Sequence, residues 1–289
     1  MSVRKFLVPV SGSESAAGAL RAGLLLARMW NAHLEVLHVS PGPQGITPYL
    51  GEGVSSVMIG DMITAAERED NARIGGLLEL FARATEETGI PVGPPLRGAN
   101  EPSASFLIMT GAEERLVAHR ARLADLTVVP HPLAGEDVAA AEALHAVLFD
   151  SGRPVLLAPV LPPPSIGSRV AVGWNGTAHA AAALASAMPF IRQARAVRIL
   201  VSDEYSRPGP GAEDVRDYIL HHGVEAEIAA FMPRDRDTGA GLLAAAEEFG
   251  ADLLAMGAYS TASRLRQLIL GGITRHVLEH ARIPVLMHR

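Results

Sequence analysis

The sequence predicts an α/β fold in which two similar domains follow one another, each with a parallel β-sheet covered by helices on both faces. Short apolar runs rich in Val, Leu and Ile, bounded by Gly or Pro, alternate with longer helical patterns. That alternation is typical of parallel sheets. The pattern then occurs a second time along the 289 residues, a length that suits two domains.

The repeat defines the two domains. Three pairs of segments match, namely Lys5–Ser13 with Arg169–Thr177, Ala124–Val129 with Ala251–Met256, and Arg153–Leu157 with Ile283–Met287. The offset is larger for the first pair than for the other two, so the first copy carries an insertion at about 41–75. Between the copies, Pro162–Pro164 reads as a stiff linker. We therefore expect domains at residues 1–161 and 167–289.

Each copy is expected to contain five strands and four helices. The predicted strands are 5–10, 33–39, 90–96, 125–130 and 154–158 in the first copy, and 169–174, 197–202, 224–230, 252–257 and 284–288 in the second. The predicted helices are 14–30, 61–88, 102–121 and 136–150, then 177–193, 211–222, 239–249 and 271–281. A long connection at 41–60 precedes the second helix. It is interpreted as a lid, a partner contact or a variable surface excursion.

Composition and charge exclude several classes of protein. Hydrophobic residues make up 48% and charged residues 19%, as in globular chains. No apolar run is long enough to span a membrane, and the apolar stretch near the N-terminus is too short for a signal peptide, so a cytoplasmic location is expected. Cysteine is absent, which excludes disulfides and thiolate metal sites, and Lys5 is the only lysine. The net charge of −6 gives no field that favours nucleic acid.

The segments that open and close each copy resemble a known family. The opening segments are Pro9-Val10-Ser11-Gly12-Ser13 and Gly173-Trp174-Asn175-Gly176-Thr177, and the closing pattern is clearest over Ala251–Met287. In this order and twice over, they resemble the universal stress protein family in its tandem form. The resemblance implies two Rossmann-like sheets of the adenine nucleotide alpha hydrolase type, with strand order 3-2-1-4-5. It also implies a role in the stress response, and in many members ATP binding where the strand order reverses.

The resemblance places a partial nucleotide site in the second copy. The family's loop is Gly-x-x-Gly, nine residues, then Gly-Ser or Gly-Thr, where glycines let phosphates approach backbone donors. Here Ser260 replaces the second glycine, ten residues follow it, and Gly272 takes the Ser/Thr position. The residues expected to contact ATP or another adenine nucleotide, together with magnesium, are Gly173, Trp174, Asn175, Val201, Gly257, Ser260, Arg264, Arg266, Gly271, Gly272, Ile273 and Thr274. The alternative is that Gly271-Gly272 merely makes a tight turn and that Trp174 fills the pocket.

The first copy is expected to have lost this site. Its fourth strand runs into Val129-Pro130-His131-Pro132, and both prolines lack an N–H donor. The next helix starts with Glu136-Asp137, whose carboxylates would oppose a phosphate there. A structural, partner-supporting role is therefore the better interpretation of this copy.

No catalytic or metal site is predicted. His276 and His280 lie four residues apart around Glu279, in the H-x-x-E-H zinc pattern, but the chain offers no third ligand downstream and the helix reads as an amphipathic cover for the sheet. Ser13 has no readable His/Asp pairing, so at most slow ATP hydrolysis is expected.

Two functions from different classes remain at this point. One is a cytoplasmic stress-response sensor that binds an adenine nucleotide in the second copy. The other is a family member that binds no nucleotide and acts as an interaction module for unidentified protein partners. In either case the resemblance implies that the two domains pair through their fifth strands, Val155–Leu157 against Val285–Met287, with homodimers as a further form. Nucleic acid and membranes are not expected partners.

Overall fold

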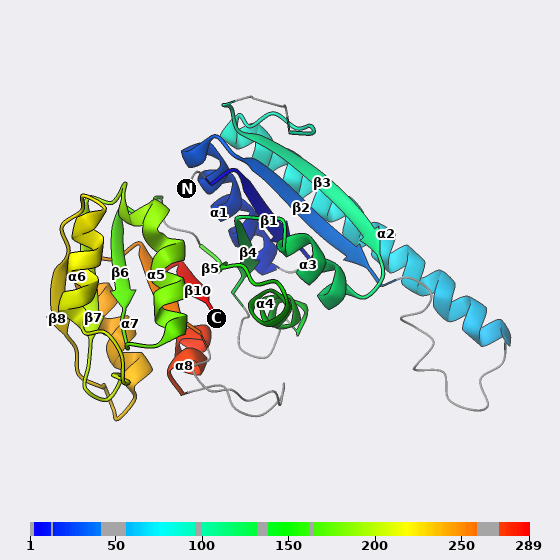
Figure 1. Ribbon diagram of the computed structural model, residues 1–289. Helices are drawn as coiled ribbons and strands as arrows, with labels where there is room; N and C mark the ends of the chain where they lie inside the picture. The colour runs from blue at the N-terminus through cyan, green and yellow to red at the C-terminus, as the bar shows by residue number, and fades with distance from the viewer. Residues whose placement is uncertain are drawn as a thin grey trace.

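The computed structural model describes residues 3–12, 14–41, 56–95, 100–131, 138–161, 164–258 and 272–289. These residues build one ten-stranded sheet covered by helices on both faces (Figure 1). The strand order is β3-β2-β1-β4-β5-β10-β9-β6-β7-β8, so each half has the order 3-2-1-4-5 counted from its own first strand. The α/β fold with a mostly parallel sheet and this strand order is confirmed.

The N-terminal half carries five strands and four helices. Its strands are β1 (Lys5–Pro9), β2 (His33–Ser40), β3 (Ser103–Thr110), β4 (Leu126–Pro130) and β5 (Val155–Ala158). Its helices are α1 (Glu14–Trp30), α2 (Ser56–Thr88), α3 (Glu113–Ala121) and α4 (Val138–Asp150). All strand pairs within this half are parallel.

The C-terminal half repeats the arrangement with shorter connections. Its strands are β6 (Arg169–Gly173), β7 (Ala196–Val201), β8 (Glu227–Ala230), β9 (Leu253–Gly257) and β10 (Val285–His288). Its helices are α5 (Ala178–Ile191), α6 (Ala212–His221), α7 (Thr238–Phe249) and α8 (Gly272–His280). The strand pairs are again parallel.

The two halves join where β5 and β10 pair in antiparallel fashion. Val285 lies opposite Leu157, and Met287 lies opposite Val155. These are the strand edges that the resemblance matched to each other. The pairing covers backbone groups that would otherwise be open to other chains.

The core forms one apolar layer on each face of the sheet. On one face, buried residues of α1, α2, α5 and α6 pack against the strands, among them Leu24, Phe81, Leu184 and Ile219. On the other face the buried residues come from α3, α4, α7 and α8, among them Val117, Leu144, Leu242 and Val277. Each layer contains buried residues of both halves, so the burial of apolar side chains also stabilises the contact between the halves.

The prediction is wrong for residues 90–121. Residues 90–96 were expected to form the third strand, but Val92 makes only an isolated bridge to Ala104. The third strand is instead β3, at the start of the segment predicted as the helix 102–121, of which only α3 is helical. Pro91 and Pro94 lack the N–H donors that a strand needs, which explains why pairing stops after one residue.

Helix α2 is longer than predicted and extends past the sheet. It covers Ser56–Thr88, whereas the sequence predicted 61–88. Figure 1 shows its first turns projecting beyond the carboxyl end of β3. Met58 and Met62 are exposed there, while Leu77 and Phe81 are buried against the sheet. Within the described ranges, no helix combines the length and the apolar character needed to cross a membrane.

Candidate functional site

The strand order of the C-terminal half reverses between β6 and β9, which lie side by side in the sheet. Helices that leave these two strands therefore cover opposite faces of the sheet, and a crevice is expected at the carboxyl ends, between the starts of α5 and α8. Ligands of open α/β sheets bind at such a place. Gly173 ends β6 there, Val201 ends β7 and Gly257 ends β9.

The turn after β6 is held by its own polar side chains. Asn175 is buried, and its Oδ1 accepts hydrogen bonds from the backbone N of Thr177 at 3.2 Å and from Thr177 Oγ1 at 2.8 Å. Thr177 Oγ1 in turn accepts from the backbone N of Ala180 at 3.2 Å and caps α5. Asn175, at the place of the family's aspartate, thus fixes the start of α5.

A loop that follows β7, residues 203–211, lies over this turn. The backbone N of Arg207 donates to the Asn175 carbonyl at 2.9 Å, and Trp174 Nε1 donates to the Pro210 carbonyl at 2.8 Å. Gly176 has φ +82°, and a Cβ built on it would lie 2.7 Å from the Arg207 carbonyl oxygen. Only glycine fits such a close approach with positive φ. The indole of Trp174 therefore anchors the loop.

Tyr205 belongs to the same loop, and its side chain is buried. It is 3% exposed, and its hydroxyl has no hydrogen-bond partner among the described residues. Its ring packs at a tilt against Phe231, with centroids 6.1 Å apart. Burial raises the pKa of the Tyr205 phenol, so the group stays neutral at physiological pH.

The end of β9 abuts the first turn of α5. A Cβ on Gly257 would lie 2.6 Å from the backbone N of Ala180 and 3.0 Å from His179 Cβ, so this strand end has no room for a side chain. Across the crevice, α8 begins at Gly272, which is exposed and has open space where a Cβ would be. Thr274 is buried in the first turn of α8, and Ile273 is half-buried. Of the predicted residues, Ser260, Arg264, Arg266 and Gly271 lie outside the described residues.

Two histidines, His179 and His288, lie near each other beside β10. Burial and, to a smaller degree, the charge of Arg289 lower the pKa of His179. Burial also lowers the pKa of His288, whose Nδ1 lies 2.8 Å from Ser186 Oγ. Both imidazoles are therefore neutral at neutral pH, and the positive charge on this side comes from arginine.

In the N-terminal half, side chains of α2 contact the turn after β1 and the end of β2. Gly12, in the turn after β1, has φ +92°, and a Cβ built on it would lie 2.6 Å from Arg73 Cγ of α2. At the end of β2, His38 is buried; its Nδ1 lies 3.0 Å from the Val10 carbonyl and its Nε2 lies 3.4 Å from Asp70 Oδ1. Charged side chains of α2 thus occupy the space between the ends of β1 and β2.

The His276/His280 pair makes local contacts. His276 Nδ1 lies 2.7 Å from Asp237 Oδ2, and the two imidazole rings are stacked with centroids 4.2 Å apart. Asp237 also accepts from the backbone N of Gly239 and caps α7. Within the described ranges, no group of three or more His, Cys, Asp or Glu side chains has a geometry that could hold a metal ion.

Comparison with known proteins decides the family. The model of the universal stress protein family matches residues 2–88 and 139–289 of the chain. The chain belongs to the universal stress protein family. No curated protein sequence gives a significant match.

Solved universal stress proteins share the fold across the full length. The crystal structure of a universal stress protein from Archaeoglobus fulgidus DSM 4304 is 17% identical, with a TM-score of 0.70, and the match covers 100% of this chain and 99% of that one. A putative universal stress protein from Pseudomonas aeruginosa UCBPP-PA14 is 14% identical, with a TM-score of 0.53 and coverage of 99% and 93%. At these identities the likeness shows the fold, in agreement with the tandem form.

The sequence did not reveal the two segments that cover the turns after β1 and β6. It did not single out Arg207, Gly209 or Tyr205, although Pro208-Gly209-Pro210-Gly211 is a strong turn signal directly after β7. It also gave no role to His38, Asp70 or Arg73. Their contacts join residues distant in the sequence, and only the path of α2 across the sheet brings them together.

Proposed function

We propose that this stress-response protein binds an adenine nucleotide, ATP with magnesium, in the crevice of its C-terminal half. The observation that carries the proposal is the open space at Gly272, the exposed first residue of α8, on the carboxyl side of β9. A helix N-terminus that begins with a glycine and is open to solvent lets a phosphate approach its backbone donors.

The electrostatics of this crevice suit an anion. The backbone N–H groups of Ala178 and His179 have no acceptor within the described ranges, as expected for the first turn of a helix. The second half of the chain, residues 162–289, carries 13 basic and 13 acidic residues, so it is neutral overall. Residues 1–161 carry 12 basic and 18 acidic residues, and the Arg73 side chain of α2 covers the turn after their first strand. The C-terminal half is therefore the better host for phosphates.

Isothermal titration calorimetry with ATP and magnesium tests the proposal. We expect about one site per chain for the wild type, with binding reduced at least roughly tenfold in Gly272→Glu. Gly272 is exposed with open space around it, so glutamate fits, and a carboxylate in the first turn stabilises a helix. Loss of binding would therefore come from repulsion of phosphate and not from unfolding.

The matched control is Gly76→Glu. Gly76 on α2 is also exposed with open space around it, so this variant adds the same charge at a distance from the crevice. It should bind ATP like the wild type. Equal loss in both variants, or equal binding in both, would contradict a site at α8.

A second candidate function is an interaction module that binds no nucleotide. It is favoured by the loop 203–211, which already contacts Asn175 and Trp174 where the base of a nucleotide is expected. Absence of ATP binding up to roughly 1 mM would support this function in place of the first.

A further inference from the structure

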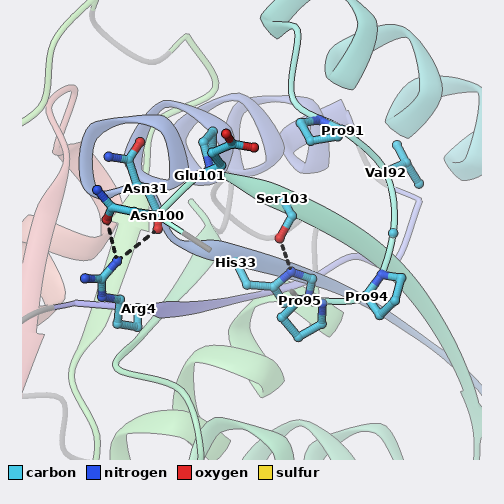
Figure 2. A pocket seen from close by; sticks show the side chains of 12 residues that line it. Arg4, Asn31, His33, Pro91, Val92, Pro94, Pro95, Asn100, Glu101 and Ser103 are labelled. Carbon is cyan, nitrogen blue, oxygen red and sulfur yellow. Dashed lines mark hydrogen bonds between the residues drawn. The ribbon is translucent and has the colours of Figure 1, made fainter. Parts of the chain in front are cut away.

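A large cavity lies at the opposite end of the sheet from the crevices. It has a volume of about 860 Å³ and is located at the amino ends of β1, β2 and β3 in the N-terminal half (Figure 2). That volume is within the range of small-molecule sites in proteins. Neither the nucleotide nor the contacts of α2 with Gly12 account for it.

The floor of the cavity is polar but neutral. His33, the first residue of β2, is buried; its Nδ1 lies 2.8 Å from Ser103 Oγ and its Nε2 lies 3.0 Å from Ser105 Oγ. Burial lowers the pKa of His33, against the charge of Glu35. The imidazole is therefore neutral near pH 7 and is held in place on both sides.

Arg4 brings a positive charge to the edge of this floor. Its Nη1 donates to the Asn31 carbonyl at 3.4 Å and to Asn100 Oδ1 at 3.1 Å, as Figure 2 shows. Within the part of the chain that the structure describes, no carboxylate forms an ion pair with Arg4, and Nε and Nη2 have no hydrogen-bond partner. A guanidinium anchored through one nitrogen keeps its other donors in the fork that matches a carboxylate.

The facing wall is apolar and stiff. It is formed by Pro91, Val92, Pro94 and Pro95, with Pro102 completing the lining. Backbone hydrogen bonds from Gly93 N to the Ala104 carbonyl at 2.8 Å and from Ala104 N to the Pro91 carbonyl at 3.0 Å tie the wall to β3. Val92 remains 61% exposed. Proline rings and an exposed valine offer a preformed apolar surface without much entropy to lose on binding.

Glu101 also lines the cavity and limits the charge of a ligand. Its carboxylate would repel a multiply charged anion such as a nucleotide phosphate. The C-terminal half offers no counterpart, because only residues 222–226 connect α6 to β8, whereas residues 89–102 connect α2 to β3. The cavity is thus a feature of the N-terminal half alone.

We propose that this cavity binds a small organic monocarboxylate, with the carboxylate on Arg4 and the apolar body against the proline wall. Sites of this kind combine mostly apolar walls with a few fixed polar groups. The site is independent of the nucleotide crevice, so ATP and the carboxylate should bind without competition.

Benzoate is the probe for the test, followed by saturation-transfer NMR on the full chain. We expect a dissociation constant on the order of 1 mM or lower, and weakening of about tenfold in Arg4→Gln because a charge-assisted pair is lost. Arg4 is exposed, so its replacement leaves the core intact. Arg216→Gln, which removes an exposed arginine from α6, is the matched control and should bind benzoate like the wild type.

Two further ligands test separately the need for the carboxylate charge and the need for the apolar ring. Benzamide, which keeps the ring but lacks the charge, should bind about tenfold more weakly than benzoate, and so should acetate, which keeps the charge but lacks the ring. The proposal is overturned if benzoate does not bind up to about 10 mM, or if Arg4→Gln binds it unchanged. Acetate or inorganic phosphate binding as tightly as benzoate would also overturn it, since either would indicate a simple anion site.

Discussion

The turns after β1 and after β6 each contain a glycine with positive φ, but different parts of the molecule lie against the two glycines. Gly12 and Gly176 both have positive φ, +92° and +82°. Gly12 is covered by the Arg73 side chain of the inserted helix α2, whereas Gly176 is covered by backbone atoms at Arg207 and Gly209 of the loop that follows β7. In both copies the cover comes from the connection between the second and third strands, a helix side chain in the first copy and loop backbone in the second.

The difference shows that the two copies of a repeated fold can stabilise equivalent turns with different contacts. In the N-terminal half, the charged side chains Asp70 and Arg73 contact His38 and the turn at Gly12 and tie α2 to the sheet. In the C-terminal half, the polar residues Asn175 and Thr177 satisfy the turn, and the start of α8 keeps open space at Gly272. The contacts of α2 therefore add to packing in the first half, and the proposed nucleotide site lies in the second.

The largest effect is expected when each glycine is replaced by alanine. Gly176→Ala should lower the free energy of unfolding by about 3–5 kcal/mol, because its Cβ meets backbone that cannot move aside and φ is strained. Gly12→Ala should cost about 1–2 kcal/mol, because the flexible Arg73 side chain can swing away and mainly the backbone strain remains. Urea unfolding of the two variants measures the difference.

A double variant sharpens this comparison. Arg73→Ala removes the side chain that the new methyl group at position 12 would meet. Adding Gly12→Ala to it should cost no more than Gly12→Ala alone, within about 0.5 kcal/mol. Equal losses for Gly12→Ala and Gly176→Ala in the original background would contradict the distinction between a side-chain cover and a backbone cover.

A smaller loss of stability is expected when the carboxylates that pair at β2 and β7, the strands next to β1 and β6, are neutralised. Glu35 on β2 is buried, and its Oε1 accepts from Arg120 Nε at 2.8 Å, with Lys5 Nζ 3.2 Å from Oε2. Arg198 holds the same register position on β7 and pairs with Glu227, whose side chain is 70% exposed. Glu35→Gln should cost about 1–3 kcal/mol, and Glu227→Gln less than about 0.5 kcal/mol.

The pH dependence separates these two carboxylates further. Burial alone would raise the pKa of Glu35, but Arg120 and Lys5 outweigh it and lower the pKa overall. A depressed pKa stabilises the fold above the unfolded value, and this contribution is lost as the pH falls through the folded value. The cost of Glu35→Gln should therefore be full at pH 7 and shrink below the ordinary glutamate range. A cost that stays constant down to about pH 2 would contradict it.

The smallest effect is expected from the hydrogen bond that anchors the loop 203–211. Trp174→Phe keeps the ring packing but removes the Nε1–H donated to the Pro210 carbonyl. The loss of about 0.5–1.5 kcal/mol should speed amide hydrogen exchange at residues 205–211 by roughly three- to tenfold. In the N-terminal half, Asp70→Asn weakens the contact to His38, which at 3.4 Å is longer than the bond of Trp174. This variant should therefore change amide exchange less than Trp174→Phe does. A larger change in exchange for Asp70→Asn than for Trp174→Phe would contradict the idea that the loop 203–211 is held more firmly than α2.

Much of this fold can be predicted from the sequence because local signals agree with it. The apolar runs that became β1, β4, β6 and β9 are short, are bounded by turn residues and occur twice, so their place in the sheet was readable. The third strand was missed because Ile90-Pro91-Val92 resembles a strand locally. Pairing with β2 selects Ser103–Thr110 instead, and that choice depends on long-range backbone bonds.

The site was predictable only in part. The ends of β6 and β9 and the start of α8 follow from the repeat, since equivalent strands end at the same edge of a sheet. The covers of the two crevices do not follow, because they depend on where an inserted helix and a proline-glycine loop come to rest. The proline wall of the cavity at Arg4 was hidden for the same reason, since its residues had been assigned to a strand.

Hydrogen exchange with and without ATP and magnesium tests most directly whether the two crevices have separate roles. Saturating ATP should slow exchange at residues 174–181 and 272–278 of the C-terminal half. Exchange at residues 8–12 and 37–41 of the N-terminal half should stay unchanged, because side chains of α2 already contact Gly12 and His38 there. Protection at both crevices, or only at the N-terminal one, would contradict the account.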